Sequence, residues 1–245
     1  MNFLRPSAVV LAAALLIQPL SAQLSAQTIQ VNKDNRTIAI TATDKVIVMA
    51  DTATVHIGFI AYGPDSDTAY ATGSRISNAI VKALTASGIP NDAIESENQN
   101  VSPVQEYQID KLTPAEKAQR KFQVVQSWTV RTPADNAAKV LDLAVKAGAN
   151  QSGQIDWSLK DENAPQAEAA AKALQRARTV ASQMAEGMSV KLGALLYASN
   201  ETQAQPPVPI IRSMAAKASA NVEPLAINPR RIEKTATVYA VFAIE

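Results

Sequence analysis

The stretch that decides the fold reads QIDWSLK over residues 154–160 and continues as an alanine-rich run, PQAEAAAKALQRARTVASQMAE, over residues 165–186. Apolar Ile155, Trp157 and Leu159 alternate with polar residues, which predicts a strand over 151–160. The run that follows predicts a long helix whose apolar residues recur at steps of three and four and therefore share one face. The residues of this face are Ala167, Ala170, Leu174, Ala177, Ala181, Met184 and Met188. Because methyl groups bury little area, the elements that cover this face must approach it closely.

Two strands are expected upstream, over 36–43 and 46–62. In the second strand, alternation predicts one core face, made of Ala53, Val55, Ile57, Phe59 and Ala61. Gly63-Pro64 ends the strand. Asp65 then caps a helix that runs to about Ser87 and stops at Gly88.

The middle of the chain predicts a hairpin and a helix. Residues 94–108 predict a strand with little apolar content, which is typical of an edge, of a solvent-facing ribbon or of a polar subunit contact. After a charged loop over 110–119, a strand over 120–131 carries Trp128 as a core anchor. Thr132-Pro133 is a helix start, and Gly148 ends that helix.

Two last strands are expected over 190–199 and 233–245. The connection over 201–231 holds five prolines, and structureless connections of this length are uncommon inside compact domains. Its apolar middle, residues 210–220, either folds back as a short helix or docks onto a neighbouring subunit.

The same order of elements occurs twice along the chain. Strand 46–62, helix 65–87 and hairpin 94–131 correspond to strand 151–160, helix 165–186 and the pair 190–199 with 233–245. The predicted fold is α+β, with two pseudo-repeated β-α-β-β units in which helices pack on antiparallel sheet.

Residues 1–26 are typical of a secretory signal peptide: Arg5, a ten-residue apolar run over 8–17, and small residues before cleavage after Ala22 or Ala26. We therefore expect a single mature domain over 27–245. The chain has no cysteine, which excludes disulfides and a lipid-modified cysteine. No later segment has eighteen consecutive apolar residues, so no membrane-spanning segment is expected in the mature chain. The expected location is periplasmic or secreted.

Composition and motifs give no catalytic constellation. The formal net charge of +1 does not fit a nucleic-acid binder. His56 is the single histidine and lacks sequence partners for a triad or a metal site. Acidic pairs, such as Asp65 with Asp67 and Asp161 with Glu162, lie where helices begin and complement the helix dipole. The sequence therefore predicts no catalytic residue, no cofactor and no metal site.

Two basic groups are interpreted as solvated surface rather than as binding patches. The first lies in the charged loop and is interleaved with acidic residues; the second lies on the polar face of the alanine-rich helix. Their members are Lys111, Lys117, Arg120 and Lys121 in the loop, and Lys172, Arg176 and Arg178 on the helix.

Four segments carry a resemblance to a known family. They read ADTATVHIG over 50–58, GIPNDAI over 88–94 followed by VSP at 101–103, GANQ over 148–151, and the alanine helix 169–181 leading into KLG at 191–193. Together they resemble the SIMPL-domain family, a domain of unknown function, from about Thr37 to Ile244. Ala50 departs from the proline that many members have there. The resemblance implies an exported bacterial α+β protein that homo-oligomerises, with no established enzyme activity.

The leading hypothesis is a non-catalytic exported envelope protein that self-assembles and has an interaction, scaffolding or envelope-stress role, including contact with an envelope partner. The alternative is a module that binds a small ligand or partner through the loop over 206–222. A hydrolase is a third hypothesis, with His56 as its only candidate base.

Overall fold

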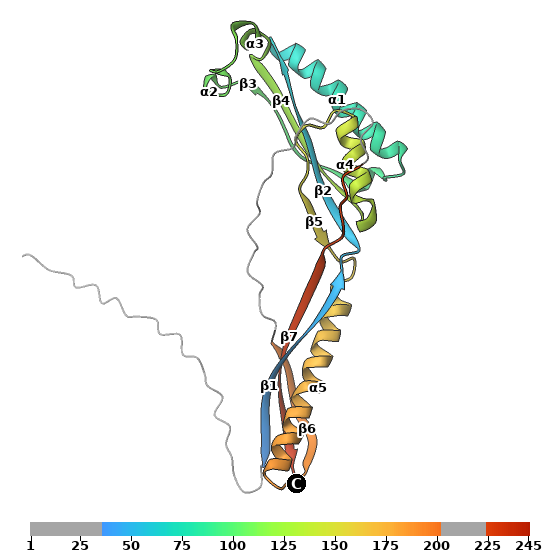
Figure 1. The fold of residues 1–245 in the computed structure, drawn as a ribbon, viewed down its shortest axis with the longest axis vertical. Helices are drawn as coiled ribbons and strands as arrows, with labels where there is room; N and C mark the ends of the chain where they lie inside the picture. The colour runs from blue at the N-terminus through green and yellow to red at the C-terminus, as the bar shows by residue number, and fades with distance from the viewer. Residues whose placement is uncertain (1–35, 202–223) are drawn as a thin grey trace, which may run out of the picture. The chain divides into compact units, whose positions relative to one another are not determined.

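The computed structural model describes residues 36–201 and 224–245 (Figure 1). The elements are β1 Thr37–Met49, β2 Thr52–Gly63, α1 Ser66–Ala86, β3 Ile94–Pro103, α2 Glu106–Ile109, α3 Pro114–Gln119, β4 Phe122–Pro133, α4 Ala137–Lys146, β5 Ile155–Ser158, α5 Asn163–Gly187, β6 Leu192–Glu201 and β7 Arg231–Ile244, with short 3-10 turns at Asn91–Ala93 and Ala134–Asn136.

One sheet has four strands in the order β3-β4-β2-β5, all antiparallel. Helices α1 and α4 pack on one face of it (Figure 1). The predicted core face of β2 is confirmed, since Ala53, Val55, Ile57, Phe59 and Ala61 are all buried.

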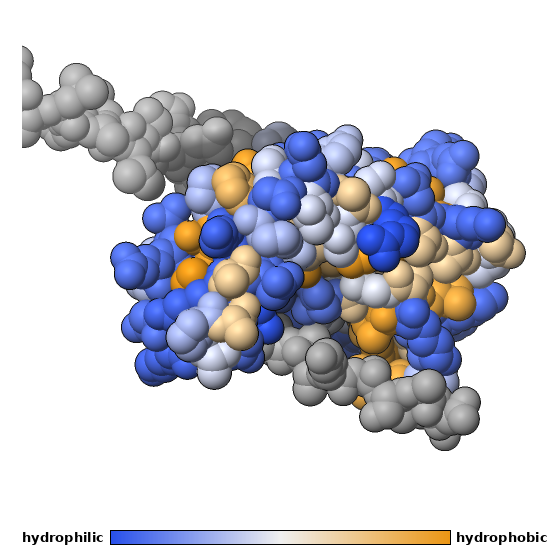
Figure 2. All heavy atoms as spheres, turned by 90° about the horizontal axis from the view of Figure 1, so that it is seen from above, coloured by the Kyte–Doolittle hydropathy of each residue, from blue (hydrophilic) through white to orange (hydrophobic). Residues whose placement is uncertain are grey.

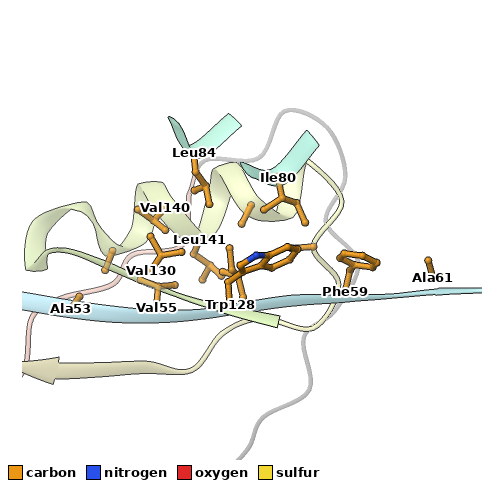
Figure 3. Close-up of a cluster of buried hydrophobic side chains, with 14 of the residues drawn as sticks. Ala53, Val55, Phe59, Ala61, Ile80, Leu84, Trp128, Val130, Val140 and Leu141 are labelled. Atoms are coloured by element: carbon orange, nitrogen blue, oxygen red, sulfur yellow. The ribbon is translucent and has the colours of Figure 1, made fainter. Parts of the chain in front are cut away.

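Trp128 of β4 lies at the centre of this core, as predicted, and is 3% exposed. Its ring centroid is 5.9 Å from that of Phe59, and Ile80, Leu84 and Val140 from the two helices close the cluster above the sheet (Figure 3). The larger hydrophobic core is therefore built on the four-stranded sheet.

The other sheet has three strands in the order β1-β7-β6, and α5 packs along it (Figure 1). The buried side of the sheet includes Ile38, Ile40, Val238, Ala240 and Phe242. Facing it, the fully buried residues of α5 are all alanines, which lets the helix backbone approach the strands closely, and Leu174 packs half-buried against the same cluster.

The predicted face of α5 is partly wrong. The buried residues recur at steps of four: Ala169, Ala173, Ala177, Ala181 and Ala185. Ala167 is exposed, and Met184 and Met188 are 46% and 50% exposed. Each residue turns an α-helix by about 100°, so residues four apart differ in direction by about 40° around the helix axis. The stripe of buried alanines therefore winds around α5 and leaves the predicted face before it reaches the methionines.

The α+β class with antiparallel sheets is confirmed, whereas the pseudo-repeat is not. β5 is shorter than the predicted strand and pairs with β2 of the four-stranded sheet, so it does not join β6 and β7. The strand beside β7 is β1 instead, paired in register from Thr37 with Ala243 to Met49 with Arg231. The predicted first strand of the second unit is therefore in the wrong sheet.

Helix α1 follows its prediction closely. The side chain of Asp65 accepts a hydrogen bond from the backbone N–H of Thr68, and Gly88 has a φ of 95° just past the helix end. The predicted start of α4 at Thr132-Pro133 is wrong, because β4 continues to Pro133 and α4 begins at Ala137. The polar strand also ends earlier than predicted, at Pro103, and lies at the sheet edge.

Two predictions fall on segments outside the described residues: the signal peptide over 1–26, and the middle of the proline-rich connection with its proposed binding loop over 206–222. Within 36–201 and 224–245, no helix has the length and apolar character needed to cross a membrane.

Candidate functional site

The sheet face opposite α1 and α4 carries the single histidine. His56 of β2 lies on this face because its neighbours Val55 and Ile57 point into the core. Its Nε2 is 2.7 Å from Oδ2 of Asp156 on β5, and its Nδ1 is 3.4 Å from Oε1 of Glu97 on β3. The imidazole thus lies between carboxylates contributed by the two edge strands of the sheet.

The sheet register explains why these groups meet. Asp156 is paired with Thr54, which lies two residues from His56 and on the same face. Glu97 lies at a β-bulge between Ser96 and Asn98, where the pairing with β4 shifts. A bulge re-aims side chains at a sheet edge, and here it brings the Glu97 carboxylate to the ring.

This geometry fits a structural link better than a catalytic or metal centre. A neutral imidazole donates through one nitrogen, so only the doubly protonated ring donates to both carboxylates. The carboxylates lie at opposite ring nitrogens and therefore cannot converge with one nitrogen on a single ion. Within the described parts of the chain, no group of three or more His, Asp or Glu residues is placed to hold a metal.

A groove of about 300 Å³ lies beside this cluster, between residues 155–157 of β5 and residues 230–233 at the start of β7. Asp156 belongs to both features, since it lines the groove and binds His56. Trp157, half-buried, forms part of the groove wall.

The segment before β5 is fixed to β2 by backbone hydrogen bonds and by the side chain of Asn150. Asn150 accepts a hydrogen bond from the Ile60 N–H at 2.8 Å and donates one to the Ile60 carbonyl at 3.0 Å. Gly148, with a φ of 118°, provides the preceding turn. These contacts give the GANQ segment a physical role: it positions β5, and with it Asp156 and Trp157.

The predicted helix-start acids have the structural roles expected of them. The backbone N–H of Thr68 lowers the pKa of Asp65. Asp161 accepts from the N–H groups of Asn163 and Ala164 at the start of α5, and Glu162 pairs with Lys234 at 3.1 Å. None of these acids contacts the His56 cluster.

The charged loop forms part of the surface, as predicted, and contains the short helix α3. The backbone N–H of Thr113 lowers the pKa of Glu116, which closes a capping box there. Arg120 lies 5.2 Å above the ring of Tyr62. Figure 2 views the molecule from the end where α2 and α3 lie in Figure 1, and most of the surface there is hydrophilic.

A second candidate site is the edge strand β6. Leu195, Leu196 and Tyr197 in its middle are 43%, 57% and 53% exposed. On α5, which packs against the same sheet, Val180, Met184 and Met188 are also exposed. Sequence reasoning missed this surface because it assigned the methionines to the core.

These features define an α+β protein of two antiparallel sheets, with a histidine–carboxylate link on one sheet and an apolar free edge on the other. A family model described as SIMPL, protein of unknown function (DUF541), matches residues 38–242. The chain belongs to this family.

Two relatives carry the name "26 kDa periplasmic immunogenic protein". The relative from Brucella melitensis biotype 1 is 26% identical over 230 residues, covering 92% of this chain and 91% of its own length. The relative from Brucella abortus strain S19 is 25% identical over the same extent. Both are similar to this chain along nearly its whole length.

Proposed function

We propose that this chain is a non-catalytic periplasmic protein that self-assembles through the free edge of β6 and has an interaction or scaffolding role in the cell envelope. The periplasmic location is supported by the names of the relatives and by the signal-like residues 1–26. The observation that carries self-assembly is the row of exposed apolar residues on β6, a strand that pairs with β7 on one side and has a free outer edge.

Free strand edges are usually protected by charges, prolines or bulges. β3 has such protection: its residues are almost all exposed and polar, it holds Glu95 and Glu97, and it ends at Pro103. β1 has Asp44 and Lys45 in its interior. The span from Leu192 to Asn200 in β6 contains neither a charged residue nor a proline, and its protection is limited to two irregularities in its pairing with β7, between Leu192 and Leu195 and between Leu195 and Tyr197.

The partner that fits this edge is a second copy of the same strand. Two β6 strands paired antiparallel would join two three-stranded sheets and repeat each contact about a twofold axis. Leu195, Leu196 and Tyr197 would then gain cross-strand neighbours from the other copy. Val180, Met184 and Met188 of α5 add apolar surface on an element packed on the same sheet.

The absence of catalysis is part of the proposal. Both ring nitrogens of His56 face carboxylates, so neither nitrogen is free to take a proton from a substrate. Asp65, Asp161 and Glu116 have roles at helix starts. The structural roles of these residues support a non-catalytic function.

Light scattering on the purified protein at tens of micromolar tests the proposal, with the Leu196→Lys variant beside the parent. Leu196 is 57% exposed, so the variant should fold, while the added charge blocks edge pairing. We expect a defined oligomer for the parent and a smaller species for Leu196→Lys. Tyr70→Lys is the matched control, because Tyr70 is 62% exposed on α1, and it should keep the parent mass. A parent that is strictly monomeric would refute self-assembly.

A further inference from the structure

The groove between β5 and the start of β7 has a distinctive pattern of charge. Four charged residues line it: Asp156, Arg230, Arg231 and Glu233. Both acids are already paired with basic side chains that do not line the groove, Asp156 with His56 at 2.7 Å and Glu233 with Lys45 at 2.8 Å. The groove's acids are therefore engaged elsewhere.

The two arginines have no such partner. Among the described residues, no carboxylate lies within salt-bridge distance of either guanidinium, and both residues are exposed. A guanidinium presents a planar fork of donors that matches a carboxylate or a phosphate in a bidentate manner. Two adjacent arginines on one wall therefore offer donors to an anionic group.

The opposite wall is suited to a planar apolar group. Trp157 of β5 is half-buried and lines the groove beside Ile155. Part of the indole packs against the core of the four-stranded sheet, and the remainder gives the groove a rigid apolar surface on which a flat ring can stack. The volume of about 300 Å³ lies at the lower end of the range for small-molecule sites.

The wall containing Trp157 is held in place by contacts already described. Asp156 is bound to His56, and the carboxylate of Asp51 accepts a hydrogen bond from the N–H of Lys160 at 2.7 Å. On the other wall, the N–H of Ala50 donates to the carbonyl of Arg230 at 2.9 Å. Both walls are therefore anchored at the junction of β1 and β2, around Ala50 and Asp51.

We propose that this groove binds a small aromatic anion, with Arg230 and Arg231 holding its carboxylate or phosphate and Trp157 stacking on its ring. The assignment does not depend on self-assembly through β6, because β6 pairs with β7 from Thr237 to Ile244, whereas residues 230–233 line the groove. It gives the chain a ligand site of defined chemistry that involves neither a metal nor a catalytic step.

Tryptophan emission of the purified protein tests this assignment, because the chain has only two tryptophans and Trp128 is buried in the core. The probes are benzoate and phenyl phosphate, with benzamide as the neutral analogue and inorganic phosphate as the anion without a ring. We expect both aromatic anions to change the emission saturably. Trp157→Phe should abolish the change.

The double variant Arg230→Gln and Arg231→Gln should weaken benzoate binding by about tenfold or more, since hydrogen bonds between charged groups are lost. Arg178→Gln, an exposed arginine on α5, is the matched control and should bind as the parent does. Calorimetric titration of the same proteins gives a second readout that does not depend on fluorescence.

Three results would overturn the assignment: no saturable response to either aromatic anion, equal binding of benzamide and benzoate, or unchanged affinity in the arginine variant. An acidic hexapeptide that binds where benzoate does not would also overturn it, because the groove would then be a protein-docking site.

Discussion

Replacing Ala177 with glutamate tests how α5 packs on the three-stranded sheet. Ala177 is 0% exposed and lies in the middle of the buried alanine stripe. Forcing a larger side chain into a packed site costs about 1–3 kcal/mol, and an uncompensated buried charge costs about 3–5 kcal/mol. We expect the free energy of unfolding to fall by roughly 4–8 kcal/mol, against a typical total of about 5–15 kcal/mol.

Thermal denaturation followed by circular dichroism measures this effect. A domain of this size loses about 2–4 °C of Tm per kcal/mol, so Ala177→Glu should melt roughly 10–30 °C below the parent or fail to fold. Ala171→Glu makes the same chemical change at an exposed position of the same helix and should melt close to the parent. Ala177→Leu adds volume without charge, so its Tm should lie between those of Ala177→Glu and Ala171→Glu.

The order of the melting temperatures of these variants separates the cost of added side-chain volume from the cost of a buried charge. If Ala177→Glu melts together with Ala171→Glu, the stripe does not face the sheet and the account of α5 packing is refuted. If Ala177→Leu is as damaging as Ala177→Glu, close packing rather than the buried charge dominates.

Three further predictions concern the core, a turn and a helix cap. Trp128→Ala should lower the free energy of unfolding in urea by about 3–5 kcal/mol, and an unchanged midpoint would contradict its central place in the core. Gly148→Ala should lower Tm more than Gly88→Ala: both glycines have positive φ, but a new Cβ at 148 lies 3.1 Å from Ile76 while the one at 88 meets open space. Because the pKa of Asp65 is lowered in the folded state, its contribution to stability is complete above about pH 4 and is lost as pH falls further. Urea midpoints between pH 6 and about pH 2 should therefore fall less steeply for Asp65→Ala than for the parent.

Local patterns predicted the parts of the fold that depend on local chemistry. The alternation of β2 gives its buried face directly, and Asp65 with Gly88 marks both ends of α1. The polar composition of β3 left an edge position as one of three alternatives, and the strand lies at the sheet edge. In each case the deciding residues are close together in the sequence.

The rotation of α5 was beyond local patterns. Alanine occurs on several sides of this helix. Hydropathy therefore distinguishes poorly between the predicted stripe, whose residues recur every 3.5 positions on average, and the observed stripe, whose residues recur every four. Packing against β1 and β7 selects the stripe with a step of four residues, which buries Ala169 and Ala185 and leaves Met184 exposed. The exposed apolar residues at this end of the helix follow from that selection.

The His56 cluster was out of reach for a different reason. Asp156 is 100 residues from His56 in the sequence, and the two meet only because β5 pairs with β2. Glu97 joins them through a bulge that no sequence signal marked. The groove has the same origin, since Trp157 and Arg230 come from segments more than seventy residues apart.

Amide hydrogen exchange at two protein concentrations tests the central claim, assembly through β6, most directly. If β6 strands pair between copies, backbone amides within 192–201 should be protected from exchange at tens of micromolar. They should lose this protection on dilution to a concentration at which light scattering shows the smaller species. Amides of β3, an edge strand of polar composition, should exchange equally at both concentrations. Exchange in β6 that does not change with concentration, while the oligomer dissociates, would contradict the proposed interface.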